Sequence, residues 1–266
     1  FRLDRLDLRD RLLLHERHLV SKELAGLGGE PAPVGATLLV QGRVGAMVNE
    51  EDHLRLQGVV SGFALEAAYA EVDRLDSELA QRLAFAFHPE FGYLSACPTN
   101  VGTGLRASVL IHLPGLVLTK EISKVLQGLA QVGLAVRGLY GEGSEVVGNF
   151  FQLSNQTTLG KSERDLLDHL GKMVREVMTY EEEARAYGLL RYARAISYEE
   201  AMNLLSGVRL GVGLQVIPDV GFYALNKMLV HTQPAHLASA HGVAIDDPSL
   251  AVRRADFVRT LLQDEG

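Results

Sequence analysis

The pattern of hydrophobic residues changes near Ala184, and this change constrains the fold more than any other feature of the chain. Before it, apolar runs of the strand type are interleaved with segments of helical spacing, whereas after it only helical spacing is found. Strands are predicted over residues 37–49, 83–87, 108–113, 134–139 and 150–154, and helices over 11–24, 65–79 and 122–129 and from 162 onward. Because no βαβ rhythm repeats, we predict an α+β fold. A largely antiparallel sheet flanked by helices would occupy residues 1–184, and a small helical C-terminal domain residues 185–266.

Two helix starts and the end of the first domain are indicated by side chains. Ser162 with Asp165, and Ser197 with Glu200, each place a hydroxyl where it can cap the first turn of a helix. The acidic run 181–183 is expected to end the α+β domain.

Composition excludes several classes of protein. The formal net charge of −7 disfavours nucleic acid as a partner. No apolar run reaches the roughly 18 to 20 residues of a membrane span, so we predict no membrane insertion and a cytoplasmic location. The single cysteine, Cys97, cannot form an internal disulfide, which favours a reducing compartment. The chain begins at Phe1, within a helical pattern, so we expect further residues upstream.

Four segments carry charges, glycines or a thiol that packing does not require. The first, residues 49–55, reads Asn-Glu-Glu-Asp-His-Leu-Arg directly after a predicted strand. Three adjacent carboxylates repel one another, and one that is held near an apolar strand end is suited to act as a general base. A solvated acidic turn is the alternative interpretation of such a triplet.

The other three segments are turns next to strands. The second, residues 97–108, contains Cys97, a Gly-Thr-Gly turn and Arg106, whose planar fork suits phosphate oxygens. It lacks the Gly-Lys-Ser/Thr ending of a P-loop, and a lone cysteine is more often a buried hydrophobe. The third, residues 137–145, adds Arg137 and Glu142, while the fourth, residues 151–160, indicates no role by itself.

The combination of these charges favours one kind of chemistry. Arg55, Arg106 and Arg137, all at strand ends, would neutralise a triphosphate, while Glu51 and Glu142 could hold and deprotonate a cationic acceptor. Phosphoryl transfer to a guanidinium requires this pairing of a positive cradle with a negative clamp, since its catalysis depends mainly on alignment and charge stabilisation.

Residues 11–184 resemble the phosphagen (guanidino) kinase family. Two signatures of that family appear in order, Asn-Glu-Glu-Asp-His-x-Arg at 49–55 and Cys-Pro-Thr-Asn-x-Gly-Thr-Gly-Leu-Arg at 97–106. The resemblance implies the catalytic domain of that family and ATP as the phosphoryl donor. It also implies Mg²⁺ that bridges the phosphates mainly through water, so no protein residue is assigned as a metal ligand.

The resemblance implies a role for each candidate residue. Glu51 would be the catalytic base, Glu142 the second carboxylate that holds the guanidinium, and Cys97 the thiolate that lies against it. The implied nucleotide-binding residues are His18, Arg55, Arg106, Ala107, Ser108, Val109, Leu110, Arg137, Gly138, Leu139, Tyr140 and Gly141.

Within the family, the chain is most similar to the bacterial protein arginine kinases. Leu-Tyr-Gly-Glu-Gly-Ser-Glu at 139–145 and Ser-Asn-Gln-Thr-Thr-Leu-Gly-Lys-Ser-Glu at 154–163 match that branch, and so does a helical C-terminal domain. This implies transfer of the γ-phosphoryl group of ATP to proteins with exposed arginine, in a stress response. An activator protein, the Clp protease machinery and a homodimer are the implied partners.

Two alternatives stay open. One is a small-molecule guanidino (arginine) kinase, and the other is a non-catalytic adaptor whose helical domain binds phosphoarginine. For the second, residues 250–255 match the Arg-Asp-x-x-Arg-Ala motif of that branch only at Arg254 and Ala255.

Overall fold

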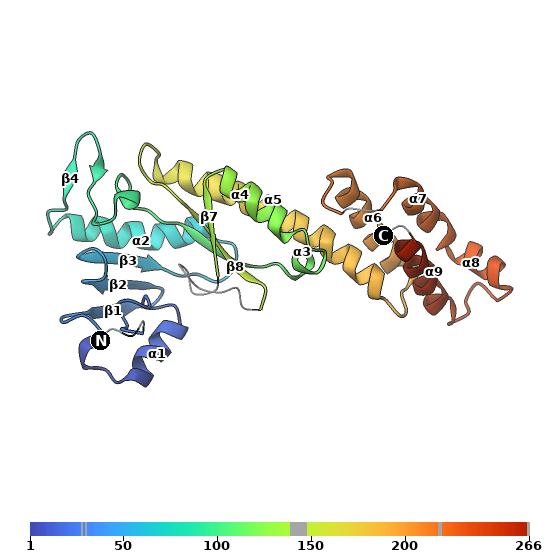
Figure 1. Ribbon diagram of the computed structural model, residues 1–266, viewed down its shortest axis with the longest axis horizontal. Coiled ribbons are helices and arrows are strands. Elements are labelled where there is room, and N and C mark those ends of the chain that lie inside the picture. The colour runs from blue at the N-terminus through green and yellow to red at the C-terminus, as the bar shows by residue number, and fades with distance from the viewer. Residues whose placement is uncertain (28, 30, 139–147, 218–219, 265–266) are drawn as a thin grey trace. The chain divides into compact units, whose positions relative to one another are not determined.

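The computed structural model describes residues 1–27, 29, 31–138, 148–217 and 220–264, which belong to two compact units (Figure 1). The first unit contains Phe1–Leu110, Gly133–Glu145 and Gln152–Lys172, and the second contains Ile111–Val132, Val146–Phe151 and Met173–Gly266.

Mixed helices and antiparallel strands confirm the predicted α+β class. The first unit holds η1 (Leu3–Arg5), α1 (Leu8–Glu16), β1 (Thr37–Gln41), β2 (Val44–Val48), β3 (Leu54–Gly58), α2 (Leu65–Ala80), β4 (Phe87–His88), β5 (Gly92–Tyr93), η2 (Pro98–Asn100) and β7 (Leu134–Arg137). The second holds α3 (Pro114–Leu118), α4 (Ile122–Gln131), α6 (Tyr198–Gly213), α7 (Phe222–His231), α8 (Pro234–His241) and α9 (Leu250–Asp264). Both units share β6 (Ser108–His112), β8 (Phe150–Asn155) and α5 (Glu163–Tyr192).

An antiparallel meander of β1, β2 and β3 starts the first unit. The single strand predicted over residues 37–49 is wrong, because Gly42 adopts a left-handed φ of 62° and reverses the chain between β1 and β2. Leu38 and Met47, which face each other across this hairpin, are buried in a cluster with Leu14 and Leu24. This core holds the start of the chain against the sheet.

Helix α2 packs closely on the last strand of the meander, as Figure 1 shows. A methyl group at Gly58 of β3 would lie 2.8 Å from Val72 Cγ2 and 2.9 Å from the carbonyl oxygen of Ala68. The predicted helix is confirmed, but the strand predicted over 83–87 is wrong. Its first residue, Leu83, still donates its backbone N–H to Leu79 as a further helical turn, and only Phe87–His88 pairs with β5.

The remaining strands form a sheet in the order β6–β8–β7. β7 and β8 are antiparallel, with Leu134 opposite Asn155 and Arg137 opposite Gln152. These strands match the predicted positions closely, because each is a short apolar run bounded by turn residues. The β6 strand starts two residues after Arg106, which therefore stands at the entrance to the sheet.

Helix α5 continues through the acidic run at residues 181–183. Glu181 is buried, and its carboxylate accepts hydrogen bonds from the backbone N–H groups of Gly115 at 2.8 Å and Leu116 at 3.0 Å. These amides open α3 and have no partner within that helix. Glu181 therefore joins α5 to α3 within the second unit.

The C-terminal helices pack around the end of α5 in the second unit (Figure 1). Ser197 caps α6 as predicted, since its hydroxyl accepts from the N–H of Glu200 at 3.1 Å. The buried Arg254 guanidinium of α9 donates to the carbonyl oxygens of Thr232 at 2.8 Å and Ile196 at 2.9 Å. The core of this unit is formed mainly by Leu190, Leu205, Val208, Leu225, Met228, Val258 and Leu262.

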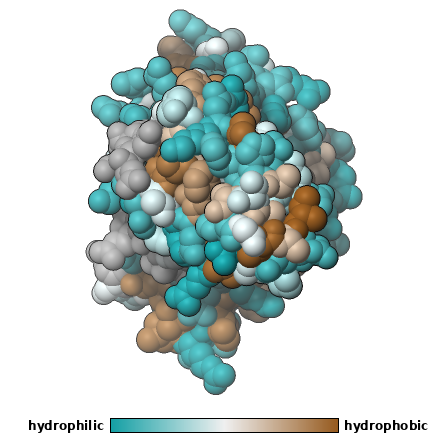
Figure 2. All heavy atoms as spheres, turned by 90° about the vertical axis from the view of Figure 1, so that its right-hand side faces the viewer, coloured by the Kyte–Doolittle hydropathy of each residue, from teal (hydrophilic) through white to brown (hydrophobic). Residues whose placement is uncertain are grey.

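The outer surface is mixed in polarity. Figure 2 shows a face on which hydrophilic residues dominate and hydrophobic residues form small separate groups. No helix among the described residues combines the length and the hydrophobicity that crossing a bilayer requires.

Candidate active site

The loop between β2 and β3 carries the predicted catalytic base, Glu51. Its neighbour Glu50 has the buried side chain, which is 6% exposed and accepts hydrogen bonds from the Glu51 N–H at 2.8 Å and from Arg55 Nη1 at 2.9 Å. Glu51 itself is exposed. Glu50 therefore shapes the loop, while the carboxylate of Glu51 faces solvent, where an acceptor can reach it.

Glu50 also fixes Arg55, a predicted phosphate ligand. Burial disfavours the charged form of Glu50, but hydrogen bonding to Ser21 and the positive charge of Arg55 outweigh it, so the pKa of Glu50 lies below its ordinary value. The carboxylate therefore stays ionised at neutral pH, and Arg55 is engaged by Glu50 in this structure.

The predicted nucleotide contact His18 lies next to the same strand. Gln57 of β3, two residues beyond Arg55, donates its side-chain amide to the backbone carbonyl of His18 at 2.5 Å. His18 adopts a left-handed φ of 57°. Partial burial, and then the nearby His15, lower the pKa of His18, which favours a neutral imidazole. The structure thus brings the His18 backbone to the strand that carries Arg55.

The turn that carries Cys97 is joined to the acidic loop. The N–H of Ala96 donates to Asp52 Oδ1 at 2.6 Å, although 44 residues separate them in sequence. Within the turn, Cys97 Sγ lies 3.0 Å from Thr99 Oγ1, and the Ser95 hydroxyl donates to the Cys97 carbonyl at 2.7 Å. The predicted base and the predicted thiol therefore belong to adjoining loops.

Gly102, in the Gly-Thr-Gly turn, permits a close backbone approach. Its φ is 116°, and a methyl group there would lie 2.8 Å from the carbonyl oxygen of Thr158 and 2.9 Å from Cα of Leu159. Its backbone also pairs with that of Tyr93. Gly102 thus allows the turn to pack directly against the segment that follows β8.

Arg137 lies on the β6–β8–β7 sheet, and Arg106 lies two residues before β6. Arg137 is directly opposite Gln152, whose side-chain amide donates to Ser108 Oγ at 3.0 Å. Residues directly opposite each other in a sheet point to the same face. Arg106 and Ser108 are both exposed, with the buried Ala107 between them. Guanidinium groups such as those of Arg106 and Arg137 suit the oxygens of a polyphosphate.

The predicted backbone positions divide into two groups. Ala107 is buried, Val109 is half-buried, and Ser108 and Leu110 are exposed. Gly138 is buried just after β7. The predicted residues Leu139, Tyr140, Gly141 and Glu142 lie outside the described residues.

The candidate site residues therefore form two groups. Contacts around β3 hold Glu51, Arg55, Cys97 and His18, and the β6–β8–β7 sheet holds Arg137, with Arg106 just before its β6 strand. A carboxylate and a thiol beside cationic side chains can bind and deprotonate a guanidinium, while the arginines bind phosphate.

Sequence reasoning assigned no role to Glu50, Asp52, Asn155 or Thr158. Their contacts join the loops that carry the candidate residues. The only signal in the sequence was their occurrence in the first and fourth polar segments.

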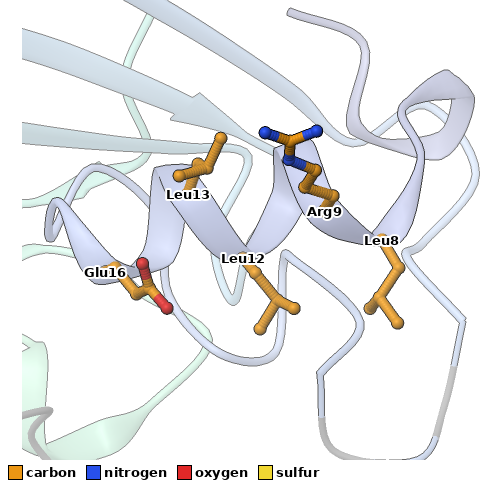
Figure 3. Close-up of a pocket in the computed structure, with 5 residues that line it drawn as sticks. All are labelled: Leu8, Arg9, Leu12, Leu13 and Glu16. Carbon is orange, nitrogen blue, oxygen red and sulfur yellow. The ribbon is translucent and has the colours of Figure 1, made fainter.

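A surface hollow of about 380 Å³ on α1 contains none of the predicted site residues. It is lined by Leu8, Arg9, Leu12, Leu13 and Glu16. In Figure 3, Leu8, Leu12 and Glu16 follow one side of the helix, and Arg9 and Leu13 follow another. We assign it no function.

Comparison with known proteins covers the whole chain. Residues 1–184 match the model of the ATP:guanido phosphotransferase C-terminal catalytic domain, and residues 176–266 match that of the protein-arginine kinase McsB C-terminal domain. The protein-arginine kinase of Symbiobacterium thermophilum is 46% identical over 270 residues, which cover 95% of this chain and 76% of that protein. That of Brevibacillus brevis is 43% identical over 279 residues, covering 98% and 77%.

A solved structure shows the same fold. The duplicated taurocyamine kinase from Schistosoma mansoni, with bound transition-state analogue components, superposes with a TM-score of 0.60 at 27% identity. The superposition covers 78% of this chain and 30% of the other. Together with the matches above, it shows that the chain belongs to the ATP:guanido phosphotransferase family.

Proposed function

We propose that this protein is a protein-arginine kinase that transfers the γ-phosphoryl group of ATP to arginine side chains of proteins, giving phosphoarginine and ADP. One observation carries the proposal: the catalytic-domain model and the McsB C-terminal-domain model match consecutive parts of this single chain. The relatives that share both parts are protein-arginine kinases.

The proposed reaction uses the two groups of residues around the sheets. Glu51 accepts a proton from the arginine guanidinium of the substrate as the nitrogen–phosphorus bond forms and the bond between the γ-phosphorus and the bridging oxygen of ADP breaks. Cys97 and Glu142 hold the guanidinium. The contact between Ala96 and Asp52 supports this assignment, because it holds the Cys97 turn beside the acidic loop.

The nucleotide side of the proposal rests on the arginines. Arg137 on the β6–β8–β7 sheet and Arg106 just before β6 bind the phosphates, and Arg55 joins them when phosphate competes with Glu50. His18, residues 107–110 and residues 138–141 complete the nucleotide site. Mg²⁺ would bridge phosphate oxygens through water, and we assign it no protein ligand.

The organisation and partners of the protein form the rest of the proposal. Residues 1–184 form the catalytic domain and residues 185–266 the helical C-terminal domain. The substrates are proteins with exposed arginine, and an activator protein, the Clp protease machinery and a second copy of the chain are the proposed partners in the cytoplasm.

The proposal is tested by removing the base. The full-length protein with Glu51→Gln should lose at least about 100-fold in ADP release with ATP and an arginine-rich protein, because the general base is gone. Glu78→Gln is the matched control, since Glu78 is exposed on α2. A non-catalytic adaptor that binds phosphoarginine would keep its biological effect in the Glu51→Gln variant. That result would reject the proposal that the protein acts as an enzyme.

A further inference from the structure

Two buried polar side chains at the end of β8 and just after it contact both loops of the candidate site. Asn155 is 4% exposed and Thr158 is 2% exposed. They belong to one short segment, Asn155–Thr158, which we call the support turn. A buried polar side chain needs a hydrogen-bond partner, so the partners it takes show what it holds in place.

Asn155 holds the backbone on both sides of Arg106. Its Oδ1 accepts from the N–H of Ala107 at 2.8 Å, and its Nδ2 donates to the carbonyl of Leu105 at 3.0 Å. The backbone N–H of Asn155 donates in turn to the carbonyl of Ala107 at 3.3 Å. One side chain thus fixes both peptide groups that flank Arg106, and with them the direction in which the guanidinium leaves the chain.

Thr158 holds the turn that follows Cys97. Its hydroxyl lies 2.7 Å from the carbonyl oxygen of Val101 and 3.2 Å from that of Thr99. Thr99 is also the residue whose hydroxyl lies 3.0 Å from Cys97 Sγ. The hydroxyl of Thr158 therefore holds the backbone of Thr99, whose own hydroxyl lies next to the Cys97 thiol.

The neighbouring residue Ser154 shows that burial alone does not explain these contacts. Ser154 is 1% exposed, and its hydroxyl has no hydrogen-bond partner among the residues that the structure describes. A polar group at this depth can therefore be tolerated without contacting the site. The contacts of Asn155 and Thr158 instead all go to backbone groups of the loops that carry Arg106 and Cys97, or to the support turn itself.

We propose that Asn155 and Thr158 are positioning residues of the kinase, which set Arg106 and the Cys97 turn at a fixed separation through one rigid turn. The inference rests on the proposed function, because it assigns phosphate binding to Arg106 and guanidinium binding to Cys97. A supporting residue of this kind acts on rate through geometry, since small displacements of a reacting group are costly.

The test uses the full-length protein with Asn155→Ala, Thr158→Val and Thr158→Ser, and Ser154→Ala as the matched control. The first measurement is kcat/KM for ATP with an arginine-rich protein. The second is the rate at which iodoacetamide alkylates Cys97, followed by mass spectrometry of the peptide that contains it. The third is amide hydrogen exchange of the peptide that contains Ala107.

Each variant should disturb one loop. Asn155→Ala should raise exchange at Ala107 and lower kcat/KM for ATP by about 10- to 100-fold, with alkylation of Cys97 within about twofold of wild type. Thr158→Val should change the alkylation rate by about threefold or more, with exchange at Ala107 unchanged. Thr158→Ser keeps the hydroxyl and should restore wild-type values, and Ser154→Ala should match wild type throughout.

Two results would overturn the proposal. One is a raised exchange at Ala107 in Asn155→Ala with unchanged kcat/KM. The other is that Asn155→Ala or Thr158→Val changes hydrogen exchange at Ala107 and alkylation of Cys97 to the same extent, which would indicate general destabilisation. Should Asn155→Ala not fold, Asn155→Asp has the same size and keeps the acceptor for Ala107, but loses the donor to Leu105, and it must lower kcat/KM. Exchange and alkylation need no catalysis, so they show whether Asn155 and Thr158 hold the two loops even if the wild type proves not to phosphorylate protein arginine.

Discussion

Three consecutive glutamates of α5 lie in three different environments, and we expect three different responses to the same isosteric change. Glu181 is buried and accepts two backbone hydrogen bonds, and Glu182 is exposed. Glu183 is 3% exposed, and within the described part of the chain neither of its carboxylate oxygens has a hydrogen-bond partner. Replacing each by glutamine removes the charge and keeps the shape.

The size of each effect follows from these contacts. Glu181→Gln leaves one acceptor and turns an NH₂ group toward an N–H of α3, so it should cost about 2–4 kcal/mol of unfolding free energy and lower the unfolding midpoint by about 5–10 °C. Glu182→Gln should stay within about 0.5 kcal/mol. Glu183→Gln should stabilise the protein by about 1 kcal/mol at neutral pH, because an unpaired amide is cheaper to bury than an unpaired charge.

The response of Glu183 should depend on pH. Burial, and then the charge of Glu182, raise its pKa above the ordinary value of 4.5. The folded state then binds more protons than the unfolded state, so stability is lost as the pH rises from the ordinary value through the folded-state pKa. The advantage of Glu183→Gln should be absent near pH 4 and should grow with rising pH.

Thermal unfolding of the four proteins, followed by circular dichroism between about pH 4 and pH 8, measures all three effects. Equal midpoints for Glu181→Gln and Glu182→Gln would refute the role of Glu181 at α3. A stabilisation by Glu183→Gln that does not change with pH would refute the buried ionised carboxylate.

Three further predictions concern the loops and the packing. Asp52→Ala removes the acceptor for the N–H of Ala96 and should lower kcat/KM about 10-fold in a coupled ADP assay. Asp52→Asn retains an acceptor oxygen and should lower kcat/KM less. Equal losses of kcat/KM in the two variants would contradict this role of Asp52. Gly58→Ala should lower the free energy of unfolding in urea by about 1–3 kcal/mol, because α2 lies against that position. Gly128→Ala, in an open part of α4, should raise it by about 0.5–1 kcal/mol. Changes of the same sign in both variants would refute the close packing of α2 on Gly58. Arg254→Met should cost about 2–4 kcal/mol in the same assay, since it leaves two buried carbonyls without donors, and an unchanged midpoint would show that these bonds are dispensable.

The parts of the fold that follow from local patterns were predictable. The helical spacing over 65–79 corresponds to α2, and Ser197 with Glu200 correctly indicates the start of α6. Capping and periodicity depend on residues within one or two turns, so they can be read without tertiary structure. The hairpin at Gly42 was missed because strand residues on both sides hid a single turn glycine.

The parts that depend on distant partners were not predictable. Nothing in the sequence indicated that Glu181 caps α3, because its partner Gly115 lies 66 residues earlier. Asn155 likewise reads as an ordinary turn residue, because its partner Ala107 is 48 residues away. For the candidate site, the sequence indicated Arg137 but could not indicate that it lies opposite Gln152, which depends on the pairing of β7 with β8.

The most direct measurement of the central claim is transfer of label from γ-³²P-ATP to an arginine-rich protein by the full-length wild type, with the acid-labile product identified by mass spectrometry. We predict phosphoarginine on the protein, with one ADP formed for each phosphoarginine. With Glu51→Gln, at least about 100-fold less phosphoarginine should form. Protein without phosphoarginine, while free arginine still yields ADP, would contradict it and identify a small-molecule guanidino kinase instead.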